Sequence, residues 1–92
     1  MADLTVRQMP AFKRVYKKLA TSDQTVMDEA VRRIVANPEI GEAKKGDLAG
    51  VFVHKFPLIR RQMLLAFEWD PKTRVLLLLG SHENFFRDLK RG

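Results

Sequence analysis

The first half of the chain has the spacing of apolar residues that is typical of amphipathic helices. From residue 10 onward, apolar side chains recur at i, i+3, i+4 and i+7 opposite lysine and arginine, namely at Phe12, Val15, Tyr16 and Leu19. A second stripe follows within residues 26–35. Pro10 favours a helix start, and Pro38 in "NPEIG" ends the second helix because the residue before a proline is disfavoured in helical conformation. The pattern predicts two consecutive helices.

After residue 50 the helical spacing gives way to runs that favour strands. "VFVHKF", "QMLLAFEW" and "RVLLLL" are rich in branched and aromatic residues, and "DPKT" separates the last two as a turn with proline at its second position. These runs predict a three-stranded antiparallel meander. Residues 2–9 alternate loosely and are a candidate edge strand, and a short helix is predicted from about Asn84 to Arg91.

The predicted order is (β)–α–α–β–β–β–α, which indicates an α+β fold. Two helices that precede a small antiparallel sheet pack on one of its faces, which leaves the other face or the rim for function. No linker, repeat or low-complexity segment divides the chain. We therefore expect residues 1–92 to form a single domain.

Composition and charge narrow the classes of function. The 92 residues include 17 Lys and Arg against 11 Asp and Glu, a net charge of +6, and this excess favours a polyanionic partner. The chain has no cysteine, which excludes disulfides and thiolate metal sites. No signal peptide is apparent, and the apolar runs are far shorter than the ~20 residues of a membrane span. We expect a soluble, cytoplasmic protein that needs no cofactor.

The positive charge is unevenly distributed. Residues 1–22 contain five Lys and Arg and one acid, whereas residues 23–43 contain two Arg and five acids. The first helix therefore has a basic face, formed by Lys13, Arg14, Lys17 and Lys18. That face is either an ordinary solvated surface or a site for nucleic-acid backbone.

The two histidines are the candidate catalytic groups. His54 shares a strand face with Phe52 and Phe56, and alternation alone does not decide whether that face is open or buried. His82 follows the last strand, where it either fills a helix junction that Ser81 caps or borders a cleft. Histidine suits proton transfer because its pKa of ~6.5 lets both forms exist near neutrality.

Two histidines with nearby cations are the groups that metal-free RNA cleavage requires. One side chain takes the proton of the 2′-hydroxyl, another protonates the leaving 5′-oxygen, and cations stabilise the charged phosphorus centre. The candidate cations are Lys55, Arg60 and Arg61, and phenylalanine can stack on an unpaired base. A metal site is disfavoured because the chain lacks cysteine and the usual histidine spacings.

Three segments of the chain are distinctive, namely "NPEIG" at the end of the second helix, "KKGDLAGVFVHKF" and "LGSHENFFRDLKR". Together they resemble the RelE/ParE superfamily, the toxins of bacterial type II toxin–antitoxin systems. The resemblance implies a small, basic, cytoplasmic toxin that a cognate antitoxin neutralises in a hetero-oligomer. RelE-like members cleave mRNA on the ribosome, whereas ParE-like members poison DNA gyrase.

The end of the chain is similar to the histidine-using, YafQ-like branch of RelE-like toxins. That branch has G-x-H followed four residues later by phenylalanine, as in Gly80, His82 and Phe86 here. The resemblance also implies a second catalytic histidine at His54. The branch's catalytic aspartate has no clear counterpart, since Asp47 comes early in the chain and Asp70 lies in the turn.

The first prediction is therefore a ribosome-dependent, metal-independent mRNA endonuclease. His82 and His54 would share acid–base work, Lys55, Arg60 and Arg61 would stabilise the phosphate, and Phe86 would hold a base. RNA backbone would bind the basic face of the first helix and three cations near the C-terminus, which are Arg87, Lys90 and Arg91. The alternatives are a non-enzymatic gyrase poison and an inactive module retained as a corepressor.

Overall fold

The structure, a computed structural model, describes residues 4–58, 61–81, 85–87 and 89. Helix α1 spans Pro10–Lys17, and helix α2 spans Thr21–Ala36. Short 3₁₀ turns follow at Pro38–Ile40 and Gly46–Leu48. Residues 85–87 and 89 are helical, as expected for the C-terminal helix. The two predicted N-terminal helices are confirmed, and the first begins at the expected proline.

The strands form one five-stranded sheet in the order β1-β5-β4-β3-β2. Their bounds are Thr5–Gln8 for β1, Glu42–Ala43 for β2, Phe52–Leu58 for β3, Arg61–Asp70 for β4 and Thr73–Ser81 for β5. The predicted meander and edge strand are confirmed. The sheet is nonetheless mixed, because β1 pairs with β5 in parallel, and the two-residue strand β2 was not predicted.

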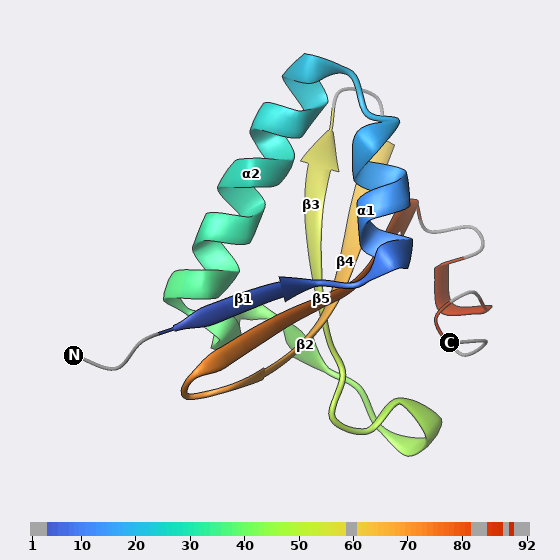
Figure 1. Cartoon of the computed structure of the whole chain (residues 1–92). Coiled ribbons are helices and arrows are strands. Elements are labelled where there is room, and N and C mark those ends of the chain that lie inside the picture. The colour runs from blue at the N-terminus through green and yellow to red at the C-terminus, as the bar shows by residue number, and fades with distance from the viewer. Residues whose placement is uncertain (1–3, 59–60, 82–84, 88, 90–92) are drawn as a thin grey trace.

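The main core lies between the two N-terminal helices and one face of the sheet (Figure 1). Phe12 from α1 and Met27 and Ile34 from α2 are almost fully buried against Leu65 and Phe67 of β4. Burial of large apolar side chains is the dominant stabilising contribution in a domain of this size. The helices therefore cover the sheet as the sequence predicts.

A second, smaller cluster covers the opposite face of the sheet. Val53, Leu64 and Ala66 are buried there beneath Phe85, which is 2% exposed, and Leu89 packs at the margin. The C-terminal helical residues therefore lie across the sheet from α2 (Figure 1). The expectation that this face is left open is only partly met, because the end of the chain covers part of it.

Two local contacts fix the ends of the strands. Gly41 lies against Phe67, and a Cβ atom at this position would be 2.6 Å from a ring carbon, so no larger residue fits without movement.

Arg74 is 7% exposed, and its Nη1 donates hydrogen bonds to the carbonyl oxygens of Asp70 at 2.6 Å and Thr73 at 3.1 Å. Its guanidinium lies 5.6 Å from the centre of the Trp69 ring, which favours a cation–π contact. Arg74 thereby ties together the β4–β5 turn.

Candidate functional site

Alternation along β3 separates two of the predicted site residues. Phe56 belongs to the main core under the helices, whereas Val53 belongs to the smaller cluster on the other face. Because successive side chains of a strand point to opposite faces, His54 lies on the helix side and Lys55 on the side of the C-terminal helical residues. Arg61 pairs with Leu58 and shares the helix side. The structure therefore does not bring His54 and Lys55 together.

His54 is half-buried against α2. Its ring stacks on Phe56, with the ring centres 5.8 Å apart and the planes at 21°. Burial lowers the pKa of His54 below its ordinary value, and the nearby Arg33 guanidinium lowers the pKa further. The imidazole is therefore neutral near pH 7. Of the two alternatives left open by the sequence, this placement matches the partly buried histidine at the sheet margin.

The register of the sheet relates His54 and Lys55 to the last residues of β5. Lys55 is in register with Leu64, and Leu64 with Gly80, two residues before His82. His54 is in register with Leu65 and Leu79 instead. Two strand spacings and two further residues along β5 place the Cα atoms of His54 and Ser81 about 12 Å apart. Gly80 therefore shares the sheet face of Lys55, whereas Ser81, which pairs with Met63 of the main core, shares the face of His54.

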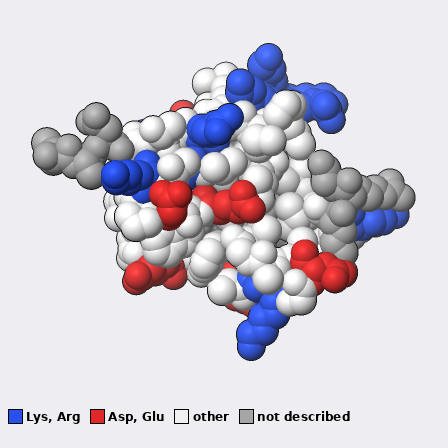
Figure 2. Space-filling model, turned by 60° about the horizontal axis from the view of Figure 1, so that its bottom comes forward, with Lys and Arg blue, Asp and Glu red and all other residues white. Residues whose placement is uncertain are grey.

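Four predicted site residues lie outside the described residues, namely Arg60, His82, Lys90 and Arg91. The remaining basic candidates are exposed. Lys13, Arg14, Lys17 and Lys18 follow the solvent side of α1, and Arg61 and Arg87 are also exposed. On the face in Figure 2, acidic side chains lie near the middle and toward the lower margin, and most Lys and Arg side chains lie toward the margins.

A small pocket surrounds Phe86, the aromatic residue predicted to hold a base. Lys44, Lys45, Asp47 and Leu48 line it with Phe86, and its volume is about 270 Å³. The Lys44 ammonium lies 5.1 Å from the centre of the Phe86 ring, and Phe85 meets that ring edge-on with ring centres 5.2 Å apart. The pocket therefore combines two cations, a carboxylate and an aromatic ring beside the C-terminal helical residues.

Lys44 is held in this pocket by a second contact. Its Nζ lies 3.2 Å from Oε1 of Glu42 on β2, and its backbone N–H donates to the carbonyl of Val51 at 2.9 Å. Lys45 and Asp47 are exposed around the positive-φ residue Gly46, which turns the chain there (φ 66°). Sequence reasoning missed the two lysines because they precede β3 and approach Phe86 only through the pairing of β2 with β3.

A larger hollow adjoins the Phe86 pocket. It has a volume of about 790 Å³ and shares Asp47 and Leu48 with that pocket. Leu77 and Leu78 of β5 line it, and Leu89 borders it from the C-terminal helical residues. The hollow is mostly apolar, so it suits bases or apolar side chains better than phosphates.

The fold agrees with the comparison to known families. Residues 6–90 match the family model described as the ParE-like toxin of type II bacterial toxin–antitoxin systems. The chain therefore belongs to this toxin family. The predicted membership in the RelE/ParE superfamily is confirmed. No curated protein sequence matches the chain.

Solved toxins share the same fold. The structure is similar to the RelBE2 toxin–antitoxin complex from Mycobacterium tuberculosis, with 22% identity, a TM-score of 0.73 and coverage of 88% of this chain and 100% of that one. The intact RelBE complex of E. coli has 15% identity, a TM-score of 0.68 and coverage of 87% and 98%. The YoeB/ParE toxin of Agrobacterium tumefaciens has 13% identity, a TM-score of 0.66 and coverage of 86% and 99%. At these identities the likeness establishes the fold alone.

Within the described part of the chain, no group of three or more His, Asp or Glu side chains is arranged to hold a metal ion. Among the same residues, no helix has the length and apolar character that a membrane crossing requires.

Proposed function

We propose that this toxin is a metal-independent endoribonuclease that cleaves mRNA on the ribosome. The observation that carries the proposal is the pocket in which Lys44, Lys45 and Asp47 surround Phe86. Phe86 stands four residues after His82, the spacing of the histidine-using toxins that this chain resembles. A histidine for proton transfer, together with cations, a carboxylate and an aromatic ring, makes up the set of groups that RNA cleavage requires.

In the proposed reaction the 2′-oxygen of a nucleotide attacks the adjacent phosphorus atom. A base removes the 2′-hydroxyl proton, the bond from phosphorus to the 5′-oxygen breaks, and an acid protonates that oxygen. The products are a 2′,3′-cyclic phosphate and a 5′-hydroxyl. His82 serves as one of these proton-transfer groups, and the lysines stabilise the additional negative charge on the phosphate oxygens.

The remaining residues of the pocket supply binding and orientation. Lys45 of the pocket is an exposed cation that can reach a phosphate, and Phe86 holds an unpaired base. Lys55, an exposed cation on β3 outside the pocket, can bind a neighbouring phosphate. Asp47 is our candidate for the carboxylate of the histidine-using branch, because the fold brings it to Phe86 despite its early place in the chain. We assign His54 a packing role, since it lies on the opposite side of the sheet from Lys55.

The ribosome and the antitoxin are the partners of this function. The exposed cations on α1 suit the phosphate backbone of ribosomal RNA, a contact that weakens as salt concentration rises. Two of the similar solved structures are toxin–antitoxin complexes, which supports a cognate antitoxin for this chain. We place this activity in the cytoplasm, where translating ribosomes are found.

The experiment incubates the purified toxin with ribosomes that carry a defined mRNA and maps cuts by primer extension. The wild-type protein is expected to cleave, and His82→Ala is expected to lower the rate by about 10²-fold or more. Gln8→Ala, on the edge strand β1, is the control and should cleave like the wild type. If His82→Ala cleaves at the wild-type rate, the proposed site is wrong.

A gyrase poison is the second candidate, and one observation favours it. The hollow beside the Phe86 pocket is mostly apolar, with Leu77, Leu78 and Leu89 partly exposed along it, and such a surface suits contact with a protein. Expression of this chain would then induce a DNA-damage response while mRNA stays intact. Translation arrest with cut mRNA would favour the ribonuclease.

A further inference from the structure

A hollow between α2 and β3 lies on the opposite side of the sheet from the proposed RNA site. Its volume is about 640 Å³. Val26 and Ala30 line it from the helix, and Phe56 and Pro57 line it from the strand. Val26 is 39% exposed, which leaves an apolar side chain at the mouth of the hollow. The hollow can therefore receive an aliphatic side chain of a partner.

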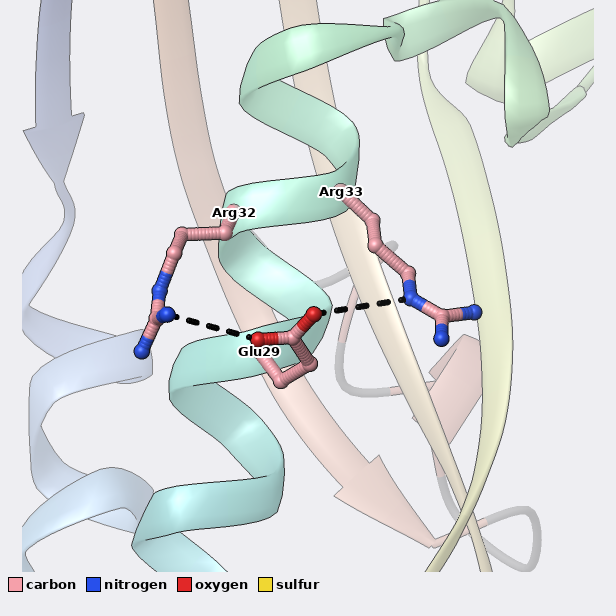
Figure 3. Close-up of polar contacts among 3 residues, drawn as sticks. All are labelled: Glu29, Arg32 and Arg33. Atoms are coloured by element: carbon pink, nitrogen blue, oxygen red, sulfur yellow. Dashed lines mark ion pairs between the residues drawn. The ribbon is translucent and has the colours of Figure 1, made fainter.

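Two arginines stand at the rim of this hollow. Arg32 Nη1 lies 3.4 Å from one carboxylate oxygen of Glu29, and Arg33 Nε lies 4.0 Å from the other (Figure 3). Glu29 therefore neutralises only part of the charge, and all three side chains are more than half exposed, so these ion pairs are easily rearranged. The rim carries a net positive charge that complements an acidic side chain.

The outer edge of β3 limits how a partner can bind here. The Val51 carbonyl accepts a hydrogen bond from the Lys44 N–H and so points away from β4. Main-chain polar groups alternate in direction along a strand, so those of Val53, Lys55 and Pro57 also point away from β4. Strand β2 covers this edge only as far as Val53, and Pro57 has no N–H group. Within β3, Lys55 alone is left to donate, so addition of a long strand is disfavoured.

We propose that this hollow is a docking site for the cognate antitoxin, which places an aliphatic side chain on Val26 and Phe56 and an acidic side chain beside Arg33. The apolar floor argues against RNA, which needs a denser set of cations. The net charge of +6 argues against a second copy of this chain, because like charges repel. The docking site rests on membership in the toxin family and is independent of RNA cleavage.

The test measures the Kd of the full-length toxin for its cognate antitoxin by calorimetry. Val26→Glu puts a carboxylate at the apolar mouth of the hollow and is expected to weaken binding by about tenfold or more. The matched control is Val6→Glu, because Val6 is 41% exposed but lies on β1 at the other edge of the sheet. Val6→Glu is expected to bind within about twofold of the wild type.

A second pair of variants tests the charged rim. Arg33→Glu replaces a side chain that is 69% exposed, so the fold should be kept, and it is expected to weaken antitoxin binding by about tenfold. Arg14→Glu makes the same change in charge on the exposed side of α1 and is expected to have little effect. This pair decides the question even if Val26→Glu does not fold.

Three outcomes would overturn the docking site. The first is antitoxin binding by Arg33→Glu at wild-type strength, and the second is equal weakening by the variants and their controls. The third is a loss of mRNA cleavage by free Val26→Glu with antitoxin binding intact, which would assign the hollow to RNA. If the wild-type chain cuts no RNA, the proposed ribonuclease fails while the calorimetry still decides the docking site.

Discussion

The two faces of the sheet are built from the same strands but differ in how they are covered. On one face, α1 and α2 enclose a core that contains Leu65 and Phe67. On the other face, a smaller cluster around Leu64 is covered by Phe85 and flanked by the Phe86 pocket and the adjoining hollow. The first face is organised for stability, and the second combines a thin cover with charged and aromatic groups. Under the proposed function, the chain uses one face for packing and the other for chemistry.

The largest expected change in stability compares the packing on the two faces of the sheet. Leu64 and Leu65 are neighbours on β4, and both are fully buried on opposite faces. Leu65→Ala is expected to lower the free energy of unfolding by about 3–5 kcal/mol, because two packed helices hold the cavity open. Leu64→Ala is expected to lower it by about 2–3 kcal/mol, because a thin cover can settle into the cavity. Urea unfolding measures both, and a larger loss for Leu64→Ala would contradict the comparison.

Gly41→Ala probes the packing of the helix side at its edge. The added Cβ would lie 2.6 Å from the Phe67 ring, so the ring or the backbone must shift. We expect a loss of about 1–3 kcal/mol in the free energy of unfolding, with a lower Tm. Gly46→Ala is the control for the loss of a glycine, because a Cβ there meets no atom within 4 Å although its φ of 66° adds some strain. A Tm for Gly41→Ala equal to that of the wild type would show that the Phe67 ring moves freely.

Lys45→Ala probes the charged side without disturbing the core, since Lys45 is exposed in the Phe86 pocket. We expect mRNA cleavage to fall by about tenfold because one phosphate-binding cation is lost. Lys72→Ala removes a lysine near the β4–β5 turn and serves as the matched control. Equal cleavage rates for Lys45→Ala and the control would show that Lys45 does not contribute to RNA cleavage.

The smallest expected effect concerns His54. Its pKa is lowered in the folded protein, mainly by burial, so the unfolded chain binds a proton at higher pH than the folded chain does. This contribution to stability is present above the unfolded pKa of ~6.5 and is lost as the pH falls through the folded pKa. The wild type should therefore lose more stability than His54→Gln between pH 7.5 and pH 5. Parallel pH profiles of Tm would contradict a neutral, half-buried His54.

The sequence was sufficient to predict the helices and the meander because their periodicities are long and regular. Phe12 through Leu19 mark one helix face, and the β-rich runs after residue 50 mark the strands. Strand β2 has only two residues, Glu42 and Ala43, which is too short for alternation to reveal. The parallel pairing of β1 was equally hidden, since its direction depends on where α1 and α2 return the chain.

The candidate site was predicted less completely than the fold. The spacing to Phe86 drew attention to the end of the chain, and the structure gives that residue a charged pocket. The contribution of Lys44, Lys45 and Asp47 depends on pairing between distant segments, which local sequence does not show. The face of His54 was undecidable because valines and phenylalanines alternate on β3, and both sets are apolar.

The division between the two faces is tested most directly by comparing His82→Ala with His54→Gln in one ribosome-dependent mRNA cleavage assay. The account predicts that His82→Ala loses about 10²-fold or more in rate, whereas His54→Gln cleaves within about threefold of the wild type. If His54→Gln loses as much activity as His82→Ala, His54 takes part in the chemistry. That result would contradict the assignment of packing to the helix side and of catalysis to the other.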